Sequence, residues 1–225
     1  MSEKERALIV GAGAGLSASL ARRLAGEGAE VALAARDPDK LAGLAAEINA
    51  RRYRCDASRR GDVEALFAAL DREMRPLDLV IYNPSRRARG PLVDLDPVEV
   101  EQALMVTAYG GFLVAQRAAK RMLARGRGSI LFTGASASVK GYAQSAPFAM
   151  GKFALRGLAQ SMARELAPKN IHVAHFVIDG SIGRDPDGEA RLDPDAIADT
   201  YLHIHRQPRS AWTWEVELRP WVERF

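Results

Sequence analysis

Residues 7–17 read ALIVGAGAGLS, a short apolar run that passes into a glycine-rich turn. The apolar residues 7–10 are typical of a buried strand, and the Ala/Leu-rich residues 18–25 predict a helix. A glycine-rich turn between a strand and a helix start forms an anion site, because bare backbone amides and the positive end of the helix dipole face the ligand. The stretch therefore predicts a turn that binds a pyrophosphate, and the alternative interpretation is a plain tight turn.

The rest of the chain repeats this alternation of short strand-like runs and longer helical stretches. Buried strands are predicted at residues 31–35, 79–82, 129–133 and 172–178, and a last strand at residues 215–218. The pattern predicts an α/β chain with a single-domain Rossmann fold, a doubly wound parallel β-sheet flanked by helices. Because no repeat, linker or shift in composition divides the sequence, we expect one domain over residues 1–225.

The composition is that of an ordinary globular domain. Of 225 residues, 48% are hydrophobic and 27% are charged, which excludes a disordered chain and supplies apolar material for a core. The single cysteine, Cys55, excludes a disulfide scaffold within the chain. The charged first residues do not form a signal peptide, and no apolar stretch has membrane-spanning length. We therefore expect a cytoplasmic protein with no membrane partner.

The charge pattern favours anionic small molecules over nucleic acid. The net charge of +4 suits a phosphate-bearing cofactor and is too small and dispersed to indicate nucleic acid by itself. Two clusters of basic residues stand out: Arg51, Arg52, Arg54, Arg59 and Arg60, and Arg86, Arg87 and Arg89. They could touch nucleic acid, but a single aromatic residue, Tyr53, interleaves them, so we favour solvated loops beside the adenosine end of a dinucleotide.

No metal site is expected. Two pairs of histidines are close in sequence: His172 and His175, and His203 and His205. Residues three apart on a strand, or two apart on a helix, do not face the same side, and no cysteine or carboxylate cluster accompanies them.

The glycine-rich turn resembles the G-x-x-x-G-x-G turn of the short-chain dehydrogenase/reductase (SDR) family. Gly11 and Gly15 match that pattern, and Ser17 stands where a third glycine is usual. Ser17 either crowds the cofactor or donates its hydroxyl to a phosphate. The resemblance extends from residue 7 to about residue 182 and implies an NAD(P)-dependent oxidoreductase, usually a homodimer or homotetramer. The cofactor-binding residues that we expect are Gly11, Gly13, Gly15, Leu16, Ser17, Arg36, Asp56, Asn83 and Lys152.

Two residues bear on how the cofactor is bound: Arg36, which follows the predicted strand 31–35, and Asp56, which belongs to residues 55–57 at the end of a further strand. Arg36 stands where dinucleotide folds meet the adenosine ribose. A guanidinium suits the 2′-phosphate of NADP, whereas an acidic residue would select NAD, so NADP is favoured and the adjacent Asp37 keeps NAD open. Asp56 resembles the family's aspartate beside adenine, and a loop cap is its equal alternative.

The usual catalytic residues of the family are missing from most matching positions. Its Tyr-x-x-x-Lys pair corresponds to Phe148 and Lys152, its serine to Ala135, and its asparagine to Thr107. A phenylalanine ring has no proton to give a developing alkoxide. Lys152 lies one helical turn after Phe148 and can still bind the nicotinamide ribose, as in the family. The resemblance therefore implies a divergent active site.

A different proton donor is needed if the chain is an enzyme. Tyr142, Tyr109 and Asp179 are candidates, and we favour Asp179 because a partly desolvated carboxyl can be held protonated near neutral pH. Capping of a turn is the alternative role of Asp179. The Gly, Pro and Asp-rich residues 180–193 predict a loop that covers the substrate.

Two functions follow from these residues. The first is an NADP-preferring oxidoreductase that acts on a small carbonyl or alcohol substrate with an atypical proton donor. The second is a catalytically inactive, cofactor-binding SDR-like protein that serves as a sensor or partner subunit, because a fold alone does not establish activity.

Overall fold

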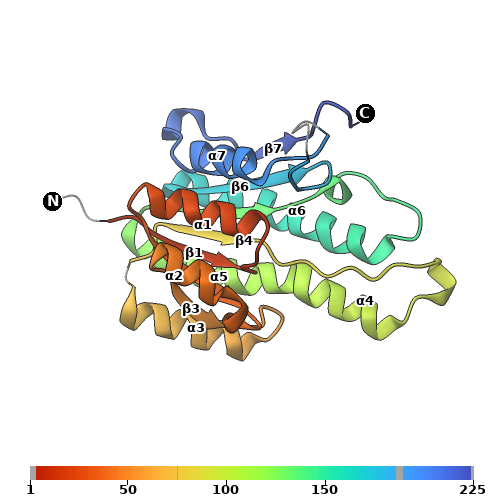
Figure 1. The fold of residues 1–225 in the computed structure, drawn as a ribbon, viewed down its shortest axis with the longest axis horizontal. Helices are drawn as coiled ribbons and strands as arrows, with labels where there is room; N and C mark the ends of the chain where they lie inside the picture. Colours follow the sequence, from red (N-terminus) through yellow and green to blue (C-terminus); the bar gives the residue numbers. More distant parts are fainter. Residues whose placement is uncertain (1–3, 75, 186–189, 224–225) are drawn as a thin grey trace.

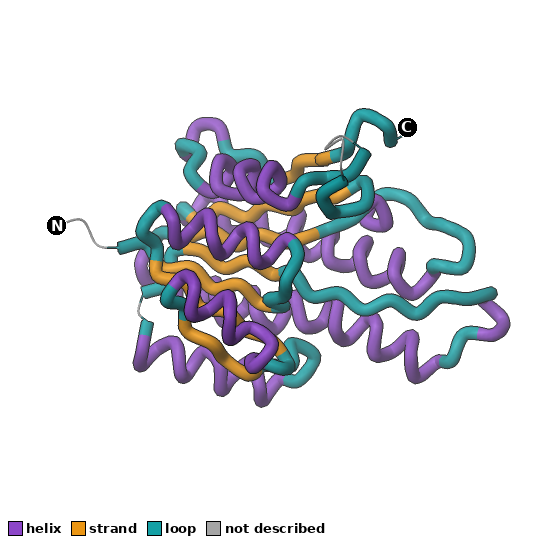
Figure 2. The backbone as a smooth tube through the Cα atoms, viewed as in Figure 1, coloured by secondary structure: helices purple, strands orange, loops and turns teal. Residues whose placement is uncertain are grey.

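A seven-stranded sheet runs through the centre of the chain (Figures 1 and 2). The computed structural model describes residues 4–74, 76–185 and 190–223. The strand order is β3-β2-β1-β4-β5-β6-β7, and every neighbouring pair is parallel. The strands are β1 (Arg6–Val10), β2 (Glu30–Ala35), β3 (Arg51–Arg54), β4 (Leu79–Tyr82), β5 (Gly128–Thr133), β6 (Ile171–Ile178) and β7 (Glu215–Leu218). The prediction of a parallel α/β sheet is confirmed.

Helices cover both faces of the sheet. They are α1 (Leu16–Gly26), α2 (Ala42–Ile48), α3 (Arg60–Glu73), α4 (Pro97–Leu104), α5 (Gly110–Arg125), α6 (Ala146–Leu166) and α7 (Pro194–His205). Buried side chains of α3, α5 and α6 form a hydrophobic core on one face, and those of α1 and α7 form a second core on the other. This is the doubly wound arrangement that the alternation of strands and helices predicts.

Strand β4 shows why the predicted strands are apolar without a break. Val80 and Tyr82 pack in the core of α3, α5 and α6, while Leu79 and Ile81 pack in the core of α1 and α7. Because successive side chains of a strand point to opposite faces, a strand covered on both faces needs apolar residues at every position.

A π-helix at Met105–Tyr109 joins α4 to α5. Its wider turn displaces the backbone from the regular helical hydrogen-bond pattern, and the Tyr82 hydroxyl donates to the carbonyl of Val106 there. Single π-turns of this kind occur frequently at functional sites. The π-helix also contains Thr107, which is fully buried.

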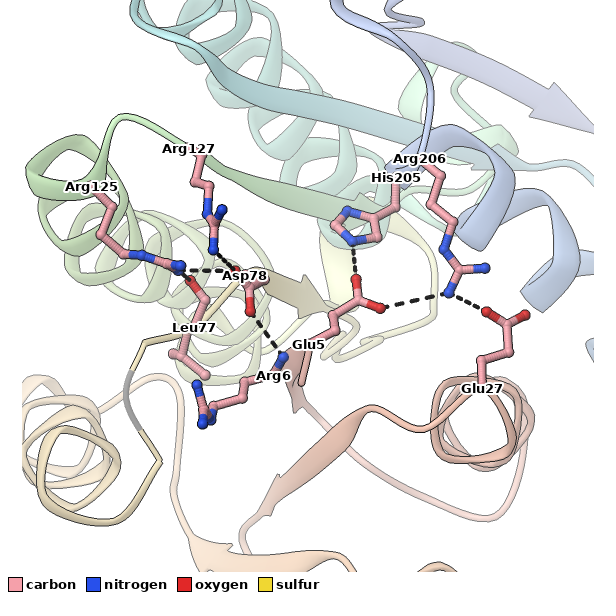
Figure 3. A network of polar contacts seen from close by, with 9 residues as sticks. All are labelled: Glu5, Arg6, Glu27, Leu77, Asp78, Arg125, Arg127, His205 and Arg206. Carbon is pink, nitrogen blue, oxygen red and sulfur yellow. Dashed lines mark hydrogen bonds and ion pairs between the residues drawn. The ribbon is translucent and has the colours of Figure 1, made fainter. Parts of the chain in front are cut away.

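Ion pairs hold the edge of the sheet where the strands begin (Figure 3). Asp78, just before β4, accepts from the amide of Arg6 at 3.0 Å and pairs with Arg125 at 2.9 Å. Glu5 pairs with His205 at the end of α7, and this hydrogen bond lowers the pKa of Glu5. His205 is thus engaged by a carboxylate, and the described residues contain no group of three or more His, Cys, Asp or Glu side chains that could hold a metal ion.

The opposite edge, where the strands end, contains the long loops. Sheet order reverses between β1 and β4, because β2 and β3 lie on one side of β1 and the later strands on the other. Ligands of open α/β sheets bind at this type of reversal, outside the carboxyl ends of the strands. Of the predicted covering loop, Gly183 and Leu192 are joined by a backbone hydrogen bond of 3.0 Å, while residues 186–189 lie outside the described part of the chain.

Within the described ranges, none of the helices combines the length and the apolar character that crossing a membrane requires.

Candidate cofactor and substrate site

A cleft of about 810 Å³ opens at the carboxyl ends of β1, β2 and β4. Its lining combines the glycine-rich turn with side chains from the loops that follow the other strands. The predicted cofactor-binding residues that line it are Gly11, Gly13, Arg36, Asp56 and Asn83. The topology therefore brings together residues that are separate in the sequence.

The glycine-rich turn needs glycine at its first position and leaves space at its second. Gly11 has a φ of +78°, and a Cβ added there would lie 2.7 Å from the ring of Pro84. A Cβ on Gly13 would meet nothing within 4 Å. Helix α1 follows without a side-chain cap on Gly15 and without an acidic residue in its first turn. An uncapped helix start beside open space fits the phosphates of a dinucleotide.

Ser17 is engaged inside the protein. Its side chain is buried, and its hydroxyl donates to the Gly11 carbonyl at 3.2 Å. The same hydroxyl accepts from the Asn83 amide at 2.7 Å. Ser17 thus connects the turn to the segment after β4, and its single hydroxyl proton is already donated to the Gly11 carbonyl. Leu16 is also buried, in the core of α1 and α7.

Arg36 lies free at the rim of the cleft while its acidic neighbour is engaged. Asp37 accepts from the amide of Asp39 at 3.2 Å and pairs with Lys40 at 3.4 Å. Arg36 is exposed and, within the described residues, has no ion pair. A cationic side chain without an internal partner is available to an anionic group of a ligand.

Asp56 combines the two roles that its sequence position allows. One carboxylate oxygen accepts from the amide of Ser58 at 3.0 Å and from its hydroxyl at 2.6 Å. The residue also lines the cleft. Capping of the turn therefore fixes the side chain at the cleft wall and does not remove it from the site.

Lys152 is buried on α6 with its charge poorly compensated. Its Nζ donates to the Thr133 carbonyl at the end of β5, at 2.6 Å. Burial, together with the positive charge of Arg87, lowers the pKa of Lys152 from 10.5 to about 7. The ammonium lies 5.8 Å from the centre of the Phe148 ring, which shares its helix face.

A smaller cavity of about 380 Å³ lies beside Phe148. Tyr142 and Ser136 line it, together with Arg87 and Arg89. Arg87 also lines the large cleft, so this residue stands where the two spaces meet. The second basic cluster of the sequence was interpreted as a solvated loop at the adenosine end. Arg87 and Arg89 are exposed, as expected of a solvated loop, and the loop after β4 also places them at the cavity beside Phe148.

Two further positions that match catalytic residues of the SDR family adjoin residues that line the site, Val106 and Ser136. Thr107 is buried in the π-helix, and its hydroxyl accepts from the Arg86 amide at 3.2 Å. Ala135 follows β5, and its amide donates to the Ser138 hydroxyl at 3.1 Å. Neither residue offers a free proton donor: the methyl of Ala135 has none, and the Thr107 hydroxyl is enclosed.

The candidate proton donors lie in three different settings. Asp179 is buried and pairs with Lys140 at 3.4 Å and with Arg219 at 3.2 Å. The carboxylate is thus occupied by two cations, and the catalytic role of Asp179 stays a prediction. Tyr109 is exposed and stacks on Phe112, whereas Tyr142 lines the smaller cavity.

A buried polar chain under the loop after β5 has no counterpart in the sequence analysis. His175 lies 3.3 Å from the Ser138 hydroxyl and 3.0 Å from the Glu215 carboxylate, which also pairs with Arg156. Burial lowers the pKa of His175 to about 4, so the ring is neutral. Ser138 is fully buried, so these hydrogen-bonded side chains support the loop and do not form a nucleophilic site. No local pattern announces it, because His175 and Glu215 lie on different strands.

Comparisons with known proteins agree with this geometry. The family model described as short chain dehydrogenase matches residues 5–180. A crystal structure of a short-chain dehydrogenase from Rhodopseudomonas palustris is 38% identical, with a TM-score of 0.87 over 98% of this chain and 100% of that one. A metagenomic short-chain oxidoreductase, solved in complex with NADP, is 28% identical, with a TM-score of 0.86 over 96% of this chain and 97% of that one. An uncharacterized oxidoreductase of Staphylococcus aureus strain N315 is 26% identical over 95% of this chain and 96% of its own length.

Proposed function

The chain belongs to the short-chain dehydrogenase family, and we propose that it is an NADP-preferring oxidoreductase acting on a small carbonyl or alcohol substrate. One observation carries this proposal: the large cleft extends from Arg36 past the glycine-rich turn to Arg87, where the smaller cavity at Phe148 begins. A dinucleotide in the cleft would bring its nicotinamide end toward that cavity. When bound, NADPH supplies the hydride.

Arg36 and Lys152 have different tasks in this proposal. Arg36, without an internal ion pair among the described residues, binds the 2′-phosphate of the adenosine ribose. Lys152 is held by the Thr133 carbonyl, and its remaining N–H donors bind the hydroxyls of the nicotinamide ribose. Asp56 and Asn83 form the walls that orient the nucleotide.

The active site that we propose is divergent in its proton transfer. Phe148 and Ala135 stand at the positions of the family's tyrosine and serine, and neither has a proton to donate. Tyr142 lines the same cavity as Phe148, which favours delivery of the proton by Tyr142 or by water over delivery by the ion-paired Asp179. Because a missing general acid typically costs a hundred- to ten-thousand-fold in rate, roughly, we expect slow turnover with simple ketones.

We also propose that the protein works in the cytoplasm as a homo-oligomer. Helices α5 and α6 expose large apolar side chains, including Phe112, Leu123 and Phe153, which are about two-fifths exposed (41%, 38% and 45%). Apolar side chains on neighbouring helices favour burial against a second copy of the chain.

Calorimetric titration with NADPH and, separately, NADH tests the cofactor assignment. We expect NADPH to bind more tightly, and Arg36→Ala to weaken NADPH about ten- to a hundred-fold while NADH changes little, because a hydrogen bond to a charged group contributes about 1.5–3 kcal/mol. Arg72→Ala, an exposed arginine of α3, is the matched control. If Arg36→Ala keeps the preference for NADPH over NADH, the proposed role of Arg36 is refuted. If neither nucleotide binds to wild type, the proposed oxidoreductase function is refuted.

A further inference from the structure

Arg87 lies against the position where the substrate would react. Its guanidinium carbon is 4.2 Å from the centre of the Phe148 ring, within the range of a cation–π contact. The guanidinium therefore lies over the ring at the edge of the cavity that Phe148 lines. Arg89 lines the same cavity from two residues further along the loop.

The smaller cavity contains positive charge without negative charge. Its lining has two arginines and several small or polar residues, and no aspartate or glutamate of the described chain lines it. Arg86, in contrast, pairs with Glu99 at 2.7 Å. Neither Arg87 nor Arg89 has an ion pair within residues 4–74, 76–185 and 190–223. Like charges without a counterion repel each other, and a bound anion would remove that cost.

The surrounding groups show this imbalance as well. Burial and the charge of Arg89 lower the pKa of Arg87. The other cation near Arg87 is Lys152, whose pKa Arg87 itself lowers. A bound carboxylate would therefore be attracted by Arg87, Arg89 and Lys152 together.

Two hydrogen bonds hold the walls of this cavity in place. The Gly90 amide donates to the Gln144 carbonyl at 3.1 Å, which joins the loop after β4 to the loop before α6. The Arg86 amide donates to Thr107 in the π-helix, immediately before Arg87. Gln144 has a φ of 57°, an uncommon conformation for a residue other than glycine, and such strain occurs at binding sites. These hydrogen bonds hold the backbone on both sides of Arg87 and Arg89.

We propose that the substrate of this enzyme has a carboxylate, and that Arg87, assisted by Arg89, binds this carboxylate in the cavity beside Phe148. This inference rests on the proposed oxidoreductase function and adds the class of substrate: an oxo acid or the corresponding hydroxy acid. Arg87 is then a specificity-determining residue. A guanidinium presents two parallel N–H donors, which match a carboxylate and not a neutral carbonyl compound.

The test uses phenylglyoxylate and its neutral methyl ester as probes. Binding of each probe is measured by calorimetry with wild type, Arg87→Gln, Arg89→Gln and the control Arg72→Gln, which makes the same change of charge on exposed α3. Each measurement is made without cofactor and with saturating NADP⁺. NADPH binding to each variant is measured separately.

We expect wild type to bind phenylglyoxylate at least about tenfold more tightly than the ester, a difference of about 1.4 kcal/mol. Arg87→Gln should abolish this preference, Arg89→Gln should reduce it, and Arg72→Gln should keep it. NADPH binding should change less than phenylglyoxylate binding in Arg87→Gln and Arg89→Gln, because the proposed contact of these arginines is with the substrate. In Arg72→Gln, NADPH binding should stay within about twofold of wild type.

Two results would overturn the inference while leaving the proposed function intact. One is equal binding of the acid and the ester by wild type that binds NADPH normally. The other is an Arg87→Gln variant that loses NADPH and phenylglyoxylate to the same extent, which would assign Arg87 to the cofactor. If wild type fails to bind NADPH, the oxidoreductase itself is refuted, and the titrations without cofactor still decide whether the cavity prefers a carboxylate.

Discussion

Replacement of Lys152 by methionine should change how the stability of the protein depends on pH. Lys152 is buried, and within the described part of the chain the Thr133 carbonyl is the only hydrogen-bond partner of its ammonium group. Burial lowers the pKa of Lys152 from 10.5 to about 7 in the folded chain. The unfolded chain therefore binds more protons than the folded chain between these two values, so stability rises with pH across this window.

The magnitude follows from the two pKa values. Their difference corresponds to a penalty of about 5 kcal/mol, at about 1.4 kcal/mol per pH unit, when the lysine is charged in both states. This penalty is complete below about pH 7 and disappears toward about pH 10.5. Between about pH 7 and pH 9 it should fall by about 2 kcal/mol. Methionine has a similar length and no charge, so Lys152→Met has no such dependence.

Urea unfolding of wild type and Lys152→Met, without cofactor, at a series of pH values from about 6 to 9 measures the effect. We expect the stability of wild type relative to the variant to increase by about 2 kcal/mol from pH 7 to pH 9. The lost hydrogen bond to Thr133 shifts the variant by about 1 kcal/mol at every pH and does not alter the slope. Lys120→Met, at an exposed position of α5, is the control and should give a constant difference. A flat difference for Lys152→Met, or one of opposite sign, would refute the reasoning.

The glycine turn and the divergent active site give the remaining predictions. Gly11→Ala should destabilise the protein by about 3 kcal/mol in urea unfolding, because its φ of +78° disfavours a side chain and its Cβ would lie 2.7 Å from Pro84. Gly13→Ala should leave stability within about 1 kcal/mol and weaken NADPH binding instead, since its Cβ enters the open cleft; equal destabilisation by both substitutions would contradict this interpretation of the turn. Phe148→Tyr combined with Ala135→Ser should raise the rate of NADPH oxidation with phenylglyoxylate by at least about a hundredfold, with Ala135→Ser alone as the control. No increase in the double variant would mean that more than the proton donor differs from the family.

Much of the fold follows from local pattern in the sequence. Continuous apolar runs separated by helical stretches specify a parallel sheet, because strands covered on both faces need apolar residues at every position. The turn at Gly11 is equally local, since its neighbours along the chain are the strand before it and the helix after it. Arg36 is a third example: its place directly after β2 puts it at the carboxyl edge of the sheet, where it lines the cleft.

The chemistry of the site was decided by contacts between distant segments. Arg87 and Phe148 meet only because the loop after β4 reaches the start of α6, a contact that the sequence pattern did not predict. The sequence shows no partner for Asp179, whereas the fold brings Lys140 and Arg219 within ion-pair distance of its carboxylate. Ser17 is similarly engaged by Asn83, 66 residues away. Periodicity reports which side of an element is buried, whereas the charge and proton state of a side chain depend on the partners that other elements bring to it.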